Sequence, residues 1–273
     1  MGKFGERDGI AILQLIVFPF IFAAAIFIWS RTGWRVGSKI WRYAVTLSLL
    51  RIAGSISTLI SINHSSDGVT RAENVCELIG IAPLLLTYIG ILRQIDTNER
   101  IPPKPLKGVT VFGIIGLILG IAGVSTASVT YAEVDGHFTY TYHPSTLAKA
   151  SMGIFIAIFA ITVLITVWLY FQLLPTLRRF QKKLFMATAL STPFLVVRLA
   201  YSALGDYDSD DQRFGLIGGD DTIYLCMSVL EEIAAMVITM ALGMLAVLEP
   251  DFVRLTRPEQ VQEAQAEPKY SPV

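Results

Sequence analysis

Seven apolar segments of about 20 to 28 residues divide this chain, and each is long enough to cross a membrane as a helix. They occupy residues 10–29, 40–61, 72–95, 109–129, 147–174, 184–204 and 222–248. The composition agrees, because 53% of the residues are hydrophobic and only 16% are charged. We therefore predict an all-α, polytopic membrane protein with a bundle of seven transmembrane helices over residues 1–250 and a disordered tail over residues 251–273.

Lysine and arginine residues are distributed unevenly between the loops, and this predicts the orientation. Fifteen of the 22 lie in the connections after the first, third and fifth segments or in the tail, against five at the opposite face. Because cytosolic loops are enriched in these residues, we expect the N-terminus outside or lumenal and the C-terminus cytosolic, in the endoplasmic reticulum or another endomembrane. The N-x-S triplet at Asn63 then falls in a non-cytosolic loop and predicts a glycosylation site.

Five ionisable side chains lie inside the apolar segments: Arg51, Glu77, Arg198, Glu231 and Glu232. Each costs about 2.5 to 3.5 kcal/mol at a bilayer centre, which indicates a buried polar site. The predicted orientation places all of them at or beyond the midplane on the non-cytosolic side. We expect two Arg–Glu pairs, Arg51 with Glu77 and Arg198 with one of the adjacent glutamates. The carboxyl left over can hold a proton near neutral pH, as a general acid requires.

The same five residues also fit a purely structural interpretation, in which the ion pairs fix how the helices pack. Glu231 and Glu232 are separated by about 100° around a helix, so they cannot face one pocket equally. Further polar groups at these depths are candidates for substrate binding, although tyrosines are also common at membrane interfaces without a special role. These candidates are Asn74, Tyr88, Tyr201 and Tyr224.

Two loops on the predicted non-cytosolic side have recognisable patterns. Residues 129–143 show the alternating pattern of strand-forming residues on both sides of Asp135-Gly136. This dipeptide is typical of a tight turn, so the segment predicts a short hairpin. It could act as a lid or be a compact solvated loop. Residues 205–221 are rich in aspartate but lack the glycine and terminal glutamate of a calcium loop, so we predict a solvated acidic loop and no metal site.

The cysteines and the charge totals indicate which bonds and partners to expect. Cys76 and Cys226 both lie in apolar segments, so we expect two separate buried thiols rather than a disulfide. The equal numbers of basic and acidic residues, 22 of each, give no sign of nucleic-acid binding. The expected partners are membrane lipids and a hydrophobic small molecule.

Three segments carry a resemblance to a known family: RAENVCELIGIAPLLLTYIGIL, TPFLVVRLAYSAL and DDTIYLCMSVLEEIAAMVI. They resemble fungal seven-helix integral-membrane terpene cyclases of the type found in ascochlorin and ascofuranone meroterpenoid biosynthesis. The resemblance implies an enzyme that protonates the terminal epoxide or alkene of a farnesyl chain on an aromatic ring, with no metal or nucleotide cofactor. Under it, Glu77 and Glu231 or Glu232 are the acid and base candidates, while Arg51 and Arg198 orient and tune them.

Two other functions remain open. Seven helices with an external N-terminus are shared with receptors, so a receptor-like or lipid-sensing protein is the main alternative. A proton-coupled transporter, with the buried charges as a relay, is the third, although the chain shows no inverted repeat. An isomeric product of unchanged mass would distinguish the cyclase from both.

Overall fold

The computed structural model describes residues 5–38, 40–62, 80–97, 100–134, 137–208, 212–214 and 219–252. Its first half contains α1 (Glu6–Thr32), α2 (Trp34–Gly37), α3 (Arg42–Ser61), α5 (Ile81–Ile95) and α6 (Pro103–Ser125). A hairpin follows, formed by β1 (Ser128–Val134) and β2 (His137–His143). The second half contains α7 (Thr146–Leu173), α8 (Arg179–Tyr207), α9 (Asp221–Tyr224), a π-helix (Leu225–Val229) and α10 (Leu230–Val247), with short 3₁₀ turns at Leu174–Thr176 and Gln212–Phe214.

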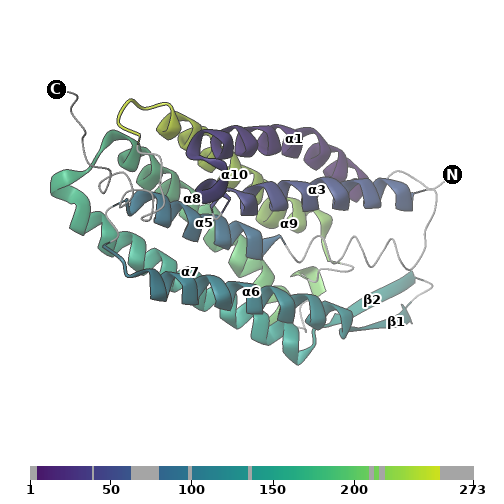
Figure 1. Ribbon diagram of the computed structural model, residues 1–273. Helices are drawn as coiled ribbons and strands as arrows, with labels where there is room; N and C mark the ends of the chain where they lie inside the picture. Colours follow the sequence, from purple (N-terminus) through teal and green to yellow (C-terminus); the bar gives the residue numbers. More distant parts are fainter. Residues whose placement is uncertain are drawn as a thin grey trace, which may run out of the picture.

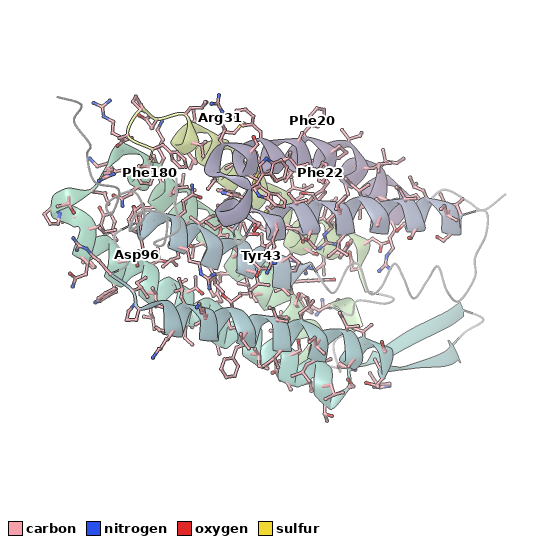
Figure 2. All side chains as sticks on the ribbon, viewed as in Figure 1. Phe20, Phe22, Arg31, Tyr43, Asp96 and Phe180 are labelled. Atoms are coloured by element: carbon pink, nitrogen blue, oxygen red, sulfur yellow. The ribbon has the colours of Figure 1, made fainter. Side chains whose placement is uncertain are left out.

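Long apolar helices dominate the described part of the chain, as the segment pattern predicts. Six of them are long and apolar enough to cross a membrane, with α9, the π-helix and α10 counting as one continuous span. The shorter, apolar α5 is the seventh helix of the bundle. Large apolar side chains such as Phe20, Leu164 and Phe171 are exposed on the outside, and Figure 2 shows Phe20 projecting from α1. Such a surface suits lipid, and the chain is a multi-pass integral membrane protein.

The helix boundaries agree with the predicted ones to within a few residues at most ends. The largest described difference is at α6, which begins at Pro103, six residues before the predicted start at 109. Proline is favoured in the first helical turn, where its missing N–H has no intrahelical partner to lose. The first part of the predicted third helix, residues 72–79, and the predicted tail beyond residue 252 lie outside the described residues.

The helices form three groups in Figure 1: α1, α3 and α10 on one side, α6 and α7 on the other, with α5 and α8 between them. Every residue of α5 except Arg93 is buried, which makes this helix the centre of the bundle. Small residues allow close contact elsewhere, as expected for membrane helices. At Gly123 on α6, an added Cβ would lie 2.5 Å from the backbone nitrogen of Ala148 on α7.

The predicted hairpin is confirmed. β1 and β2 pair antiparallel, with Tyr131 opposite Tyr140 and Val134 opposite His137. The hairpin extends from the end of the bundle where α6 ends and α7 begins, and we call this the hairpin end. Its side chains lie outside the described part, so its predicted role as a lid stays a prediction.

Candidate functional site

Three of the predicted intramembrane charges, from three different helices, meet inside the bundle. Nε of Arg51 on α3 donates a hydrogen bond of 2.6 Å to Oε1 of Glu232 on α10. The Nη2 group of Arg51 donates to Oε2 of the same carboxylate, so the pair is bidentate. Nε of Arg198 on α8 lies 3.8 Å from Oε2 of Glu232. We call Arg51, Arg198 and Glu232 the charged cluster.

The charged cluster forms because its members lie at matching positions along their helices. Arg51 lies ten residues before the end of α3 at Ser61, and Arg198 lies nine before the end of α8 at Tyr207. Glu232 lies eleven residues after α9 begins at Asp221. At about 1.5 Å per residue, all three are roughly 13 to 17 Å from the hairpin end. These three residues therefore lie at similar distances from the hairpin end.

Burial makes the charged cluster costly to break. Arg51 and Arg198 are each 3% exposed and Glu232 is 1% exposed. Removing one partner of a buried ion pair typically costs about 3 to 5 kcal/mol, because the other charge stays desolvated. The charges thus tie α3, α8 and α10 together at one depth.

Neighbouring segments hold Arg51 in position. Oγ of Ser55, one turn further along α3, bonds to the Arg51 carbonyl at 2.8 Å and to Oε1 of Gln14 on α1 at 3.0 Å. Gly80, directly before α5, lies against the Arg51 guanidinium, and an added Cβ there would clash with Nη2. A glycine at this position therefore leaves room for the arginine, which the sequence pattern did not indicate.

Arg198 has hydrogen-bonding capacity that the charged cluster does not use. Its Nη1 donates to Oγ of Ser202 at 3.0 Å, and its guanidinium carbon lies 5.9 Å from the ring centre of Tyr201. Its Nε is buried and has no hydrogen-bond acceptor within the described ranges. An unsatisfied buried donor costs free energy.

Glu231 lies beside the charged cluster in sequence but does not join it. It is half-buried, and its Oε2 has no hydrogen-bond partner among the residues described. The preceding residues Leu225–Val229 form a π-helix, a feature found frequently at functional sites. Of the two adjacent glutamates, Glu232 is the one paired with arginine and Glu231 is the carboxyl left over.

A small cavity adjoins Arg198 between α7 and α8. Its volume is about 40 Å³, room for roughly three water molecules. From α8 it is lined by Arg198, Tyr201, Ser202, Gly205 and Asp206, and from α7 by Ala148, Ser151, Met152 and Phe155. Both sets follow the three- and four-residue spacing of one helix face. Ile81 and Phe214 complete the lining.

Asp206 is a site residue that the sequence interpretation missed. We predicted it in a solvated acidic loop, but α8 continues to Tyr207, so Asp206 is helical and half-buried on the cavity wall. The hydroxyl of Tyr207 donates to the Lys149 carbonyl at 2.6 Å and ties α8 to α7. A signal was present, since Asp206 continues the spacing of Arg198 and Ser202 at four-residue intervals.

Aromatic side chains cover the hairpin end of the cavity. The Tyr201 ring centre lies 6.3 Å from that of Phe214 and 6.3 Å from that of Tyr224. Arg7 on α1 lies above Tyr224, and its Nε donates to Oδ1 of Asp221 at 2.7 Å. Tyr201 therefore lines the cavity and Tyr224 lies next to it.

The other predicted site residues are not part of this arrangement. Tyr88 is buried on the central helix α5 and is not among the residues lining the cavity. Asn63, Asn74 and Glu77 lie outside the described residues, as does the predicted Arg51–Glu77 pair. Cys226, predicted as a buried thiol, is instead exposed, because it lies on the outer face of the π-helix.

A buried charged cluster beside a cavity, inside a bundle of membrane-spanning helices, defines a polytopic membrane protein with an internal polar site. The chain belongs to a family described as a domain of unknown function (DUF7702), whose profile matches residues 4–248. No curated protein matches the chain.

Proposed function

We propose that this protein is a membrane terpene cyclase, which protonates an epoxyfarnesyl chain on an aromatic precursor and directs its cyclisation. The observation that carries the proposal is the cavity, which combines a carboxyl, an arginine and aromatic rings in an otherwise apolar setting. Acid-initiated cyclisation needs these groups: a proton donor, aromatic faces that stabilise positive charge, and exclusion of water. The resemblance of three helices to fungal cyclases supports the same function.

Asp206 is the proposed proton donor, because it lines the cavity together with Tyr201, Phe155 and Phe214. Its proton goes to the epoxide oxygen, the C–O bond breaks, and the oxygen keeps the electron pair as a hydroxyl group. The π electrons of a neighbouring alkene then form a C–C bond to the cationic carbon. A base removes a proton from the final cation, so substrate and product have the same mass.

The glutamates have other proposed roles. Both oxygens of Glu232 accept hydrogen bonds from Arg51, which favours the charged carboxylate over the acid. Glu231 is the candidate base, and Glu77 remains a second candidate for acid or base. The cavity volume of about 40 Å³ suits only the reacting end of a long substrate, so the rest of the chain lies towards lipid.

Microsomes that contain the protein test this proposal when they are incubated with an epoxyfarnesyl phenol and analysed by chromatography with mass detection. We expect an isomeric product of unchanged mass. Asp206→Asn should reduce its formation about 100-fold or more, the usual contribution of a general acid. Glu231→Gln tests the base, and Asp208→Asn, at an exposed aspartate just after α8, is the matched control.

Failure to form any isomer from several such substrates would refute the cyclase. Full activity of Asp206→Asn would instead refute the assigned proton donor and leave the function standing. Membrane content of each variant, measured by immunoblot, must match that of the unchanged protein.

A receptor-like or lipid-sensing function is the second candidate, and the arginine on the cavity wall, Arg198, favours it. A receptor binds such a ligand and releases it unchanged. Saturable binding without turnover in the same microsomes would therefore favour sensing over catalysis.

The orientation with the N-terminus outside or lumenal, residence in an endomembrane, and glycosylation at Asn63 remain part of this proposal. The distribution of basic residues between the loops supports them.

A further inference from the structure

We infer that the cavity beside Arg198 binds the carboxylate head of a single-chain amphiphile, such as a fatty or isoprenoid acid. This inference concerns binding alone and does not depend on the proposed cyclase activity. Three features support it: a buried arginine on the cavity wall, the charges around it, and the size of the cavity.

The donor is the guanidinium of Arg198, which lines the cavity and is 3% exposed. Its Nε is fully buried and lies 3.8 Å from Glu232, whose carboxylate is held by two donor groups of Arg51. A ligand oxygen can therefore contact the part of the guanidinium that lines the cavity, and arginine binds carboxylates in a planar, forked geometry.

The neighbouring groups favour an anion at this position. Ser202 accepts the Nη1 hydrogen bond of Arg198. Both serines on the wall, Ser202 and Ser151, can donate hydrogen bonds to neutral or anionic oxygens. The acidic side chain on the wall is Asp206, eight residues from Arg198 or about 12 Å along α8. Lys149 on α7 is its charged neighbour. An anion beside Arg198 is therefore distant from Asp206. The nearer carboxylate is that of Glu232, 3.8 Å from Nε, and the two arginines of the charged cluster outnumber it.

The size and remaining lining identify the rest of the ligand. A volume of about 40 Å³ suits a small head group such as a carboxylate. Ile81, Met152 and Phe155 make the rest of the wall apolar, and the neighbouring Ile156 is exposed on the outer face of α7. A hydrocarbon tail can therefore remain in the bilayer while the head occupies the cavity.

Competition against a photoreactive, diazirine-labelled fatty acid tests the inference, with the full chain in phosphatidylcholine nanodiscs. Dodecanoic acid, dodecanol and dodecylamine have equal chains and differ in their heads. We expect the acid to displace the label at a concentration about tenfold lower than the alcohol, because a hydrogen bond between charged partners exceeds a neutral one by roughly that factor. Farnesoic acid in place of dodecanoic acid distinguishes an isoprenoid from a straight-chain source.

Arg198→Met should abolish the preference for the acid, and Arg31→Met, at an exposed arginine in the last turn of α1, should retain it. Ser202→Leu fills the cavity without touching Glu232 and should prevent displacement even if Arg198→Met does not fold. Equal potency of acid and amine would overturn the inference. So would an acid preference that persists in a folded Ser202→Leu protein. Because the assay contains no epoxide, its outcome is separate from the test of cyclase activity.

Discussion

Arg51 shows how one residue can be both costly and necessary. Its guanidinium is nearly inaccessible, yet it holds both oxygens of Glu232 and fits against Gly80, where a side chain would not be accommodated. Buried ion pairs are weak evidence for net stability, but loss of one partner is severe. The stability of the bundle should therefore depend on the pair as a unit.

Arg51→Met should lower the free energy of unfolding by about 3 to 5 kcal/mol, because Glu232 keeps its desolvated charge. The double variant Arg51→Met, Glu232→Met should recover only part of this loss, because it also removes the carboxylate beside the buried Arg198. Thermal melting of the detergent-solubilised protein measures both. Arg7→Met is the matched control: its bond to Asp221 is about 30% exposed at both ends, and such a pair contributes only about 0 to 1 kcal/mol. An equal loss in the single and double variants would contradict coupling between the two residues.

At the residue scale, the sequence located the charges better than their partners. Arg51, Arg198 and Glu232 could be singled out because an ionisable group in an apolar helix is expensive. Their pairing depends on how each helix is rotated about its axis, which no local pattern encodes. The sequence interpretation therefore did not predict that both arginines approach Glu232, while its Arg51–Glu77 pair lies outside the described residues. Asp206 was missed because further aspartates follow it within a few residues.

At the scale of elements, the helix pairs differ in what joins them. Polar groups connect α3, α8 and α10, whereas α6 and α7 approach through small residues. Ser151 on α7 adds a hydrogen bond of 2.7 Å to the Gly116 carbonyl on α6, and Ser145 adds one of 2.8 Å to the Gly123 carbonyl. The backbone contact at Gly123 makes this pairing sensitive to a single methyl group.

Gly123→Ala should separate α6 from α7 and reduce the free energy of unfolding by about 1 to 3 kcal/mol, because the added Cβ meets the Ala148 backbone, which cannot rotate away. Gly108→Ala on the same helix is the matched control, since nothing lies within 4 Å of its added Cβ. There the change should be neutral or slightly stabilising. The melting temperatures of the two variants are compared. An equal decrease in both would show that the effect does not depend on the contact between α6 and α7.

The elements themselves could be predicted well, for a simple physical reason. A membrane requires long apolar helices, so hydropathy alone located α1, α3, α7 and α10 to within a few residues. The hairpin was predictable from its alternating pattern and turn dipeptide. The π-helix was not, because nothing in LCMSV differs from an ordinary helical segment.

For the whole molecule, the distribution of charge makes a prediction about its orientation. Connections at the end opposite the hairpin carry most of the basic residues, and Figure 2 shows Arg31 and Phe180 at that end. This end should face the cytosol. The charged cluster and cavity would then lie in the half of the membrane away from the cytosol.

Asn63 provides the measurement, because only lumenal sequons receive glycans. The protein expressed in a eukaryotic host should migrate faster on electrophoresis after treatment with an N-glycosidase, and Asn63→Gln should migrate at the faster position without treatment. Ser66→Ala, outside the triplet, is the control. A tag fused to the C-terminus should become accessible to antibody when the plasma membrane alone is permeabilised, because it faces the cytosol. Accessibility of that tag only after the endomembrane is also permeabilised would reverse the proposed orientation.

The π-helix also has a consequence for insertions and deletions. A π-turn accommodates one residue more than an α-turn, so Leu225–Val229 sets the rotation between the two ends of a single transmembrane helix. Asp221 and Tyr224 can therefore face α1 while Glu232 faces α3, with each end aligned to its own neighbours. Loss of one residue from this segment would turn one end by about 100° relative to the other, so the length of the helix, as well as its composition, is under constraint.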